Sequence, residues 1–277
     1  MQFLESELKE GENQKEGSRF QIIPCPMEKT VSYGSGTSAG PKAIIEASQE
    51  LERSLICKQG IFTQQAIDCS TDHKTCLSEL RHRVSKVAET KKFPIILGGE
   101  HSLSWAAING VADALGEKIG IIQIDAHADL RESYEGNPHS HASVMNLLVK
   151  EGYKLASLGV RALCEQEKNF RKEHGVIYWD AEELVRNQTN QADLPSDFPD
   201  QVYVSFDLDG LDPSVMPAVG TPVPGGLAYY QAIDLVESAL QGKTCVGMDL
   251  VELSPVNGDI VSPFTASCLL QRLMELV

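Results

Sequence analysis

Short apolar runs alternate with helix-like segments along the whole chain, and this alternation leaves few folds open to it. Seven runs have the length and composition of buried strands, namely Phe20–Ile23, Phe93–Leu97, Ile119–Ile124, Lys154–Val160, Val176–Trp179, Val202–Phe206 and Thr244–Val251. Five segments between them predict helices: Gly40–Leu51, Thr75–Thr90, Ser102–Leu115, Ala142–Lys150 and Tyr229–Leu240. Strands that alternate with helices form mainly parallel sheets covered on both faces. We therefore expect an α/β fold with three layers, αβα, around a mainly parallel central sheet.

The chain of 277 residues contains no internal repeat and no low-complexity segment. The polar stretch Asn187–Pro199 is too short to mark a domain boundary, so residues 19–277 are expected to form a single domain. Residues 1–18 carry many charges and no apolar run. We expect this N-terminal segment to be disordered and not to act as a signal peptide.

The composition excludes several classes of partner. A formal net charge of −15 argues against nucleic acid and anionic membranes, and it weakly favours a cationic substrate. No run approaches the roughly 20 apolar residues of a membrane span. The 7 cysteines are scattered and never form a Cys-x-x-Cys pair, which is typical of reduced thiols. We expect a cytoplasmic protein without a nucleic-acid or membrane partner.

Polar motifs follow four of the predicted strands directly. They are Gly98–Ser102, Asp125–Asp129, Asp207–Asp209 and Glu252. Ligands of such sheets bind outside the carboxyl ends of the strands, so these motifs should converge on one rim. Side chains alternate along a strand, and Asp125, His127 and Asp129 would share one direction if strand geometry continued to Asp129.

The motifs contain two imidazoles and four carboxylates, a set that suits manganese, iron or zinc. The candidate ligands are His101, Asp125, His127, Asp129, Asp207 and Asp209. The set contains no cysteine, which argues against a structural zinc site, and six ligands exceed the need of one tetrahedral ion. Four crowded carboxylates also require positive charge between them. Two divalent cations that share bridging carboxylates satisfy both conditions.

Each motif alone has a plainer interpretation. A single Asp-x-His can be a solvated strand end, and Gly98–Ser102 alone can be a helix start capped by Ser102. Asp207–Pro213 resembles the start of a calcium loop but lacks its later spacing and final glutamate. The joint placement of all three motifs at strand ends favours the metal interpretation.

The three motifs Gly98–Ser102, Asp125–Asp129 and Ser205–Pro213 resemble the metal motifs of the ureohydrolases, the family of arginase, agmatinase, formiminoglutamase and guanidinobutyrase. The resemblance runs from about Gly34 to the C-terminus. It implies two Mn²⁺ ions, one held by His101, Asp125, Asp129 and Asp207 and the other by Asp125, His127, Asp207 and Asp209. It also implies a homo-oligomer, either a trimer or a hexamer.

The resemblance assigns further roles. His141 matches a histidine that moves protons to the leaving amine, with His139 as its competitor two residues away. Glu252 matches a glutamate that pairs with the substrate guanidinium, and Asp129 would orient the attacking water and accept its proton. Asp212 is interpreted as structural, at the turn before Pro213. Asp249 is at most a supporting residue.

Within this family the chain is most similar to microbial agmatinases, through residues 30–44 and 129–142. Ala162 and Cys164 stand where arginases carry acids for the substrate α-amino group, which speaks against arginase. We therefore expect an enzyme of polyamine biosynthesis that hydrolyses agmatine, a small cationic guanidine, to putrescine and urea. Ala142 and Asn146 depart from the agmatinase pattern and put the distal substrate contacts in doubt. Aminopropylagmatine, guanidinobutyrate, arginine and formiminoglutamate remain as alternatives.

Two interpretations from other classes stay open. A deacetylase-like hydrolase would keep one zinc ion, and the presence of both His101 and His127 argues against it. A non-catalytic metal-binding scaffold would be expected to lose ligands, whereas all six are present. Arg131 could meet a substrate carboxylate, but a solvated surface arginine is the simpler interpretation.

Overall fold

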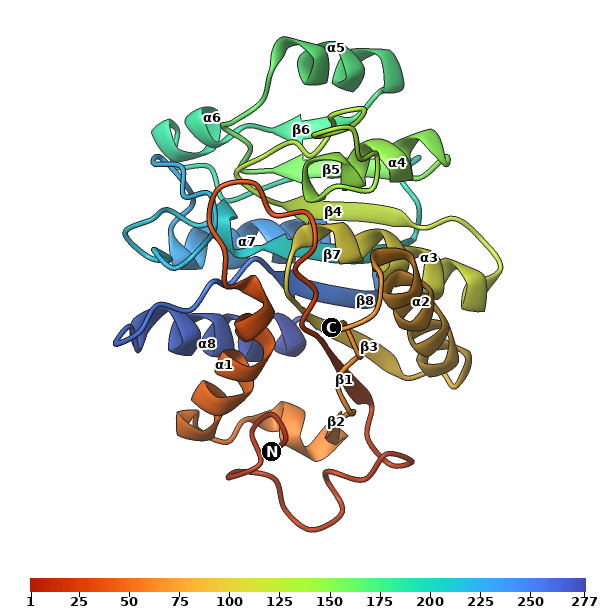
Figure 1. Cartoon of the computed structure of the whole chain (residues 1–277), viewed down its shortest axis with the longest axis vertical. Coiled ribbons are helices and arrows are strands. Elements are labelled where there is room, and N and C mark those ends of the chain that lie inside the picture. The colour runs from red at the N-terminus through yellow and green to blue at the C-terminus, as the bar shows by residue number, and fades with distance from the viewer.

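A computed structural model describes residues 1–277 and contains one eight-stranded sheet in which all neighbouring strands are parallel (Figure 1). The strand order is β2-β1-β3-β8-β7-β4-β5-β6. The strands are β1 (Phe20–Cys25), β2 (Ile61–Thr63), β3 (Phe93–Gly98), β4 (Gly120–Ile124), β5 (Lys154–Leu158), β6 (Ile177–Trp179), β7 (Gln201–Asp207) and β8 (Thr244–Val251).

Eight α-helices cover the two faces of this sheet (Figure 1). One hydrophobic core contains side chains of α1 (Gly40–Ala47), α6 (Ala181–Arg186), α7 (Tyr229–Ala239) and α8 (Val261–Glu275). The core on the opposite face contains side chains of α2 (His73–Glu89), α3 (Ser104–Leu115) and α4 (Val144–Lys150), and α5 (Glu165–His174) packs against it through Phe170. The expected αβα fold with its parallel central sheet is confirmed.

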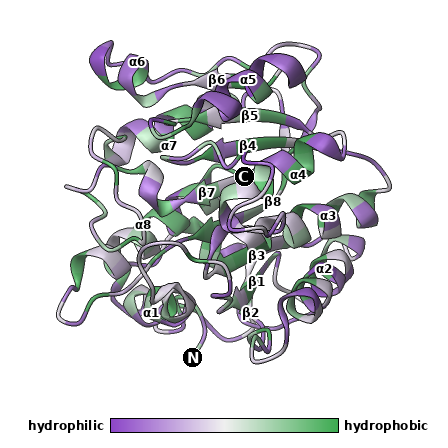
Figure 2. Cartoon of the chain, turned by 45° about the horizontal axis from the view of Figure 1, so that its top comes forward, coloured by the Kyte–Doolittle hydropathy of each residue, from purple (hydrophilic) through white to green (hydrophobic).

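The pattern of apolar residues explains why both faces are covered. Along β7, Val202, Val204 and Phe206 enter one core and Tyr203 enters the other, as alternation of side chains requires. The central strands are accordingly apolar on both sides, and Figure 2 shows them as green ribbons inside more polar surroundings. Such continuous apolar runs are typical of parallel sheets buried between two helical layers.

The structure contains one strand and three α-helices that the sequence did not predict: β2, α5, α6 and α8. β2 has only three residues and lies at the sheet edge. Phe170 is the only large apolar residue of α5, so this helix has no apolar stripe to reveal it. α6 has only six residues, and α8 carries Ser262 and Pro263 in its first turn. Their assignment depends on packing that local periodicity does not contain.

The N-terminal segment, expected to be disordered, packs against the domain in the structure. Phe3 and Leu4 are fully buried, and the Leu4 backbone N–H donates to Ser48 Oγ over 2.9 Å. Arg53 donates two hydrogen bonds to the Glu12 carboxylate, of 2.6 and 2.8 Å. Many charged residues surround Phe3 and Leu4 in the sequence, so their burial could not be predicted from composition.

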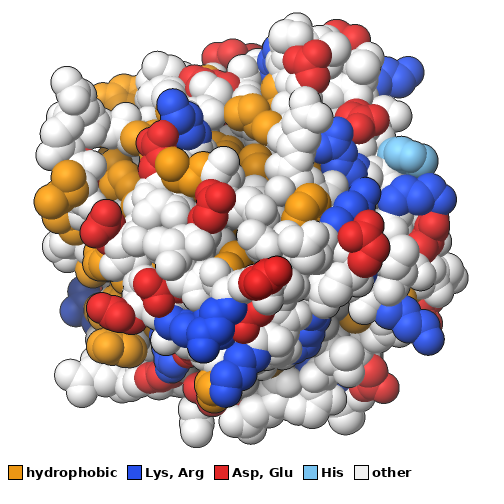
Figure 3. All heavy atoms as spheres, turned by 90° about the horizontal axis from the view of Figure 1, so that it is seen from below, with side chains coloured by type: hydrophobic (Ala, Val, Ile, Leu, Met, Phe, Trp, Pro, Cys, Tyr) orange, Lys and Arg blue, Asp and Glu red, His pale blue; other side chains and the backbone are white.

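On the face shown in Figure 3, acidic and basic side chains lie interspersed with apolar ones.

None of the helices combines the length and the apolar character that crossing a bilayer would require.

Candidate active site

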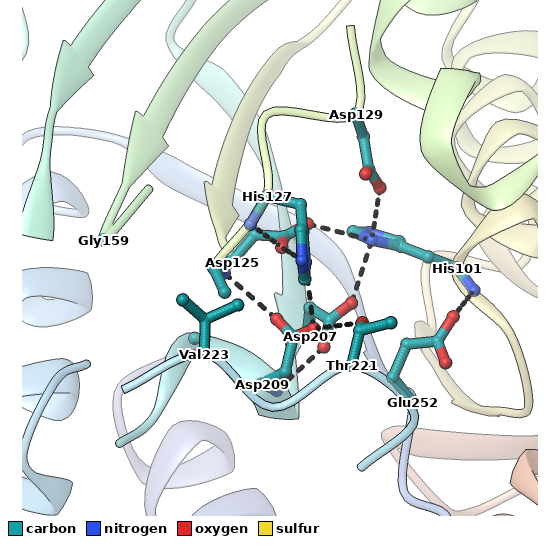
Figure 4. Close-up of polar contacts among 12 residues, drawn as sticks. His101, Asp125, His127, Asp129, Gly159, Asp207, Asp209, Thr221, Val223 and Glu252 are labelled. Carbon is teal, nitrogen blue, oxygen red and sulfur yellow. Dashed lines mark hydrogen bonds and ion pairs between the residues drawn. The ribbon is translucent and has the colours of Figure 1, made fainter. Parts of the chain in front are cut away.

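The candidate residues lie at the carboxyl ends of four neighbouring strands, β3, β8, β7 and β4. His101 follows β3 in a short 3-10 turn, and Glu252 follows β8 directly. The register pairs Ile124 with Phe206, so the residues that follow β4 and β7 emerge side by side. The structure thus brings all six candidate ligands together on one rim, as Figure 4 shows.

The first donor group surrounds the imidazole of His101, which is almost fully buried. Its Nδ1 lies 3.1 Å from Asp125 Oδ2, 3.0 Å from Asp129 Oδ2 and 3.3 Å from Asp207 Oδ2. None of these contacts has hydrogen-bond geometry, and this buried nitrogen has no hydrogen-bond partner. One nitrogen therefore faces three carboxylates without a hydrogen bond to any of them, an arrangement that ligands around a cation also have.

The other nitrogen of the same ring explains this orientation. His101 Nε2 lies 2.9 Å from Ser205 Oγ, and the Ser205 hydroxyl donates to Asp249 Oδ1 over 2.9 Å. A hydroxyl has only one proton, so Ser205 accepts from Nε2–H while it donates to Asp249. This chain places the imidazole proton on Nε2 and directs the lone pair of Nδ1 at the carboxylates. Second partners of this kind commonly orient metal-binding histidines.

The second donor group comprises Asp125, His127 and Asp209. His127 Nδ1 lies 3.0 Å from Asp209 Oδ2 and 3.6 Å from Asp125 Oδ1. Backbone N–H groups hold the carboxylates in place: Ala126 donates to Asp209 Oδ1 over 3.0 Å, and Asp209 donates to Asp207 Oδ1 over 2.8 Å. Asp125 belongs to both groups, so the two potential cation positions share a carboxylate.

The pKa values show how strongly these acids repel one another. Burial and the charge of Asp125 raise the pKa of Asp129 to about 7, and burial with the nearby Asp209 raises the pKa of Asp207 well above its usual range. The pKa of His127 rises to about 12, because Asp125 and Asp209 stabilise its charged form against the opposing effect of burial. A site with this negative potential attracts cations.

The donor chemistry fits two divalent metal ions. Imidazole nitrogens and carboxylate oxygens are both present, no thiol is among them, and the buried Nδ1 of His101 lacks any other partner. Four carboxylates carry four negative charges, which two divalent cations would balance. The residues that could hold a metal are His101, Asp125, His127, Asp207 and Asp209, and Asp129 lies 3.0 Å from His101 beside them.

A cavity of about 350 Å³ opens beside the two donor groups, and Glu252 and His141 are among the residues that line it. Glu252 Oε1 accepts a 2.7 Å hydrogen bond from the backbone N–H of His101. His141 Nδ1 lies 3.9 Å from Glu252 Oε1, and its buried Nε2 has no hydrogen-bond partner. Burial lowers the pKa of His141. Burial raises the pKa of Glu252 to about 8. A carboxyl group, a neutral imidazole and the ligand cluster thus face one small space.

Two residues of the site have backbone conformations that non-glycine residues rarely adopt. Asp129 has φ 52° and Glu252 has φ 67°. Such left-handed conformations cost roughly 1–3 kcal/mol and cluster at functional sites. Because β4 ends at Ile124, strand alternation does not continue to Asp129. The turn at Asp129, not an extended strand, directs its carboxylate to His101.

The structure places the other candidates outside the ligand cluster. The His139 ring packs edge-on against Trp105 with centroids 5.5 Å apart, and His139 does not line the cavity. Asp212 accepts backbone hydrogen bonds from Ser214, Gly225 and Gly226, which confirms its structural role in the turn.

The structure also shows the contacts of four further residues that the sequence analysis singled out. Asn146 is buried and donates to the backbone carbonyl of Leu130 over 2.9 Å. Arg131 is exposed at the cavity, with its guanidinium 5.6 Å from the centroid of the Tyr134 ring. Ala162 and Cys164 line the cavity and supply no carboxylate there.

Sequence reasoning missed two residues that support the site. Arg161 donates to the backbone carbonyl groups of Asp209, Leu211 and Val223 over 2.7, 3.1 and 2.8 Å, and thereby fixes the loop after β7. Ser205 determines the tautomer of His101 by accepting a hydrogen bond from its Nε2. The signal for Ser205 was its position two residues before Asp207, on the same side of β7.

Comparison with known proteins agrees with this geometry. A family model described as the Arginase family matches residues 18–275. An N(1)-aminopropylagmatine ureohydrolase of Synechocystis is 33% identical over 288 residues, covering 99% of this chain and 92% of that protein. A protein of the same name from Thermus thermophilus is 35% identical over 272 residues, covering 94% and 91%. The crystal structure of agmatine ureohydrolase of Thermoplasma volcanium matches with a TM-score of 0.81 and 26% identity, covering 100% of this chain and 94% of that one.

The family match and both relatives extend over nearly the whole length of the chain, including every strand end that carries a candidate ligand. We conclude that this chain belongs to the arginase family and is a ureohydrolase, a hydrolase of guanidino carbon–nitrogen bonds.

Proposed function

We propose that this ureohydrolase hydrolyses N1-aminopropylagmatine to urea and spermidine, using two Mn²⁺ ions. The observation that carries the reaction is the position of Glu252, whose carboxylate lines the same cavity as the ligand cluster. The choice of substrate is supported by the names of two relatives that align over nearly the whole chain. The product would place the enzyme in polyamine biosynthesis.

The six ligands would be divided between the two ions, with Asp125 and Asp207 shared. One ion would take His101, Asp125, Asp129 and Asp207, and the other Asp125, His127, Asp207 and Asp209. Two divalent cations would supply an acidified water and positive charge opposite the developing transition state. Mn²⁺ is favoured because carboxylates dominate the donor set.

Glu252 would bind the guanidinium of the substrate. A carboxylate accepts two parallel hydrogen bonds from a guanidinium, and this pairing fixes the position of the central carbon. Oε1 already accepts from the His101 backbone N–H, but each carboxylate oxygen has a second lone pair. The same hydrogen bond sets the distance between Glu252 and the segment that carries His101. The hydrogen bond from the His101 backbone to Glu252 would therefore position the substrate guanidinium relative to the ligand cluster.

Asp129 and His141 would move the protons. Asp129 Oδ2 lies within 3.0 Å of His101 Nδ1, at the edge of the ligand cluster, and Asp129 also lines the cavity. It can therefore orient the attacking water and accept its proton. His141 Nδ1 lies 3.9 Å from Glu252 Oε1, and its buried Nε2 has no hydrogen-bond partner. Its neutral ring can take up a proton from solvent and pass it to the departing amine, which leaves as a neutral or cationic group.

The remainder of the cavity suits a polyamine chain better than an amino acid. Ala162 and Cys164 offer no charged partner to an α-amino group. Glu167 also lines the cavity, but its carboxylate accepts from the backbone N–H groups of Leu130 and Cys164 over 3.1 and 2.8 Å. The overall charge of −15 favours a substrate with several cationic groups.

Agmatine, the substrate expected from the sequence, is the second candidate. It shares the guanidinobutyl part of aminopropylagmatine and would meet Glu252 in the same way. It is favoured by the likeness to the agmatine ureohydrolase of Thermoplasma volcanium, which is more distant in sequence than the two relatives above.

The test is urea release by Mn²⁺-loaded protein offered aminopropylagmatine, agmatine, arginine and guanidinobutyrate in parallel, with formiminoglutamate followed by glutamate release. We expect aminopropylagmatine to have the highest kcat/KM, by about tenfold over agmatine. An equal or higher value for agmatine would assign the enzyme to agmatine instead. Glu252→Gln should lose urea release while it retains two Mn²⁺ ions per chain, because Glu252 is not a ligand. Loss of the metal in this variant would contradict the assigned role.

The oligomeric state remains a prediction. Size-exclusion chromatography with light scattering distinguishes the expected trimer or hexamer from a monomer.

A further inference from the structure

A second cluster of potential ligands lies away from the carboxylate centre and consists of three thiols. Cys25 is the last residue of β1, Cys69 lies between β2 and α2, and Cys76 is in the first turn of α2. The Sγ atoms of Cys69 and Cys76 are 2.9 Å apart, and those of Cys25 and Cys69 are 3.9 Å apart. All three sulfur atoms lie within 4.8 Å of one another. Three separate segments therefore direct their thiols to one point.

We propose that Cys25, Cys69 and Cys76 form a binding site for one thiophilic metal ion such as Zn²⁺. A tetrahedral ion with Zn–S bonds of about 2.3 Å places its sulfur ligands about 3.8 Å apart. The observed separations lie on both sides of this value, so small side-chain rotations bring the three sulfur atoms to an ion. Thiolates select Zn²⁺ or Cu⁺ over Mn²⁺. The two centres would therefore select different metals by donor type.

The protonation of the trio favours cation binding. The nearby thiols of Cys25 and Cys69 lower the pKa of Cys76 well below its usual range, with smaller contributions from the charges of His73 and Lys29. The pKa of Cys25 rises correspondingly, through the other two thiols and burial. A metal ion that binds the three sulfur atoms would displace the remaining thiol protons, because thiolates are the ligands.

The location of the trio permits both access and retention of an ion. Cys25 and Cys76 are buried, with at most 1% of their surface exposed, whereas Cys69 is partly exposed. An ion can therefore enter from the side of Cys69. Apolar residues of the core under α2 and α3 surround the two buried thiols, and this environment strengthens the binding of a charged ion to thiolates.

An ion in this site would stabilise the segment that carries His101. The Cys25 carbonyl accepts from the Gly99 backbone N–H over 2.9 Å, and the Met27 carbonyl accepts from the Glu100 N–H over 2.8 Å. A side chain at Gly99 would collide with the Met27 backbone, so the segments that follow β1 and β3 are packed closely against each other. Fixing Cys25 to the loop and to α2 therefore also restrains the turn that leads to the carboxylate centre.

The test uses Cd²⁺ as the probe on fully reduced protein whose carboxylate centre is already loaded with Mn²⁺. Cadmium bound to thiolates absorbs in the ultraviolet by ligand-to-metal charge transfer, whereas cadmium bound to oxygen and nitrogen ligands does not. We expect this absorption to grow until one Cd²⁺ per chain is bound. It should be lost in Cys69→Ser and Cys76→Ser, and kept in Cys57→Ser, a buried cysteine outside the trio.

Thermal unfolding provides the second measurement. Zn²⁺ should raise the Tm of the wild type and of Cys57→Ser by several degrees, and should leave the Tm of Cys69→Ser unchanged. Cys69 is partly exposed, so its replacement by serine should leave the fold intact, and the far-ultraviolet circular dichroism of the variant verifies this. Absence of the thiolate absorption from reduced wild-type protein, or its persistence in Cys69→Ser, would overturn the proposal.

Discussion

Ser205 Oγ and His101 Nε2 lie 2.9 Å apart, and this single contact determines which nitrogen of His101 faces the carboxylates. The serine hydroxyl is already committed as a donor to Asp249 Oδ1. His101 must therefore donate from Nε2, and its Nδ1 remains as an electron-pair donor within 3.3 Å of three aspartates. The neutral hydroxyl of Ser205 thus orients the imidazole of a candidate metal ligand.

We expect Ser205→Ala to lower Mn²⁺ affinity by roughly 10- to 100-fold, because the imidazole loses its orienting partner and Asp249 loses a donor. Electron paramagnetic resonance of free Mn²⁺ during titration measures this affinity. Ser267→Ala is the matched control, since Ser267 is a buried serine that donates only to the backbone carbonyl groups of Ile44 and Pro263. Equal affinities for the two variants would contradict the positioning role.

Replacing a shared carboxylate should affect both metal positions together. We expect Asp207→Asn to bind neither Mn²⁺ ion firmly and to lose about a thousandfold or more of urea release, because an amide neither bridges cations nor balances their charge. Metal content after gel filtration is measured by plasma mass spectrometry. Asp193→Asn, at an exposed aspartate, should keep both ions. Full activity in Asp207→Asn would exclude a centre of two ions.

The two neighbouring histidines should differ sharply. His141→Ala is expected to lower kcat by roughly 10²- to 10⁴-fold with a small change in KM, because the departing amine loses its proton donor. His139→Ala should stay within about twofold of the wild type, since its ring packs on Trp105 outside the cavity. Steady-state kinetics of both variants, at saturating Mn²⁺, measure the contrast. The reverse ranking would transfer the role to His139.

The N-terminal segment should contribute to stability as an integral part of the domain. Phe3 is fully buried, and Phe3→Ala is expected to lower the free energy of unfolding by roughly 3–5 kcal/mol. Urea denaturation followed by circular dichroism measures the change. Tyr230→Ala, at an aromatic residue with 71% of its surface exposed, should change the free energy by less than about 0.5 kcal/mol. A negligible effect of Phe3→Ala would restore the expectation of a disordered segment.

Acid should remove the contribution of the Glu12–Arg53 ion pair. Hydrogen bonds from Arg53 and the Lys9 backbone lower the pKa of Glu12 from 4.5 to about 2. A carboxylate with a lowered pKa in the folded state stabilises the protein above pH 4.5 and loses this effect as the pH falls toward 2. The difference in Tm between wild type and Glu12→Gln should therefore shrink over that range. Glu10→Gln, a nearby exposed change, should show no such trend.

The sequence predicted the composition of the site better than its geometry. Charge balance and strand ends selected six candidate ligands that the structure brings close together, because parallel strands bring their carboxyl ends to one edge of the sheet. The direction of Asp129 could not be predicted from alternation, since β4 ends at Ile124 and Asp129 lies in a left-handed turn. Arg161 was missed because its partners are backbone carbonyl groups, which no side-chain motif reveals.

The elements of the fold also divide into those that the local sequence predicts and those that depend on distant contacts. The seven strands expected from apolar runs are present, because burial on both faces produces a signal in the local sequence. β2 pairs only with β1 at the sheet edge, and α5 consists almost entirely of charged and polar residues. Elements of this kind are determined by neighbours distant in the sequence. The convergence of Cys25, Cys69 and Cys76 also depends on tertiary contacts, and their spacing alone resembles that of ordinary free thiols.

The all-parallel sheet has a consequence for the order in which the chain folds and binds metal. Neighbouring strands are separated by long stretches of chain, several of them not consecutive in the sequence, and the hydrogen bond between His101 and Glu252 links positions 151 residues apart. Contacts of this range form slowly, because loop closure must precede them. Metal retention would therefore report that the last strands have been inserted. A polypeptide still emerging from the ribosome would carry most of the ligands and yet have no centre to hold an ion.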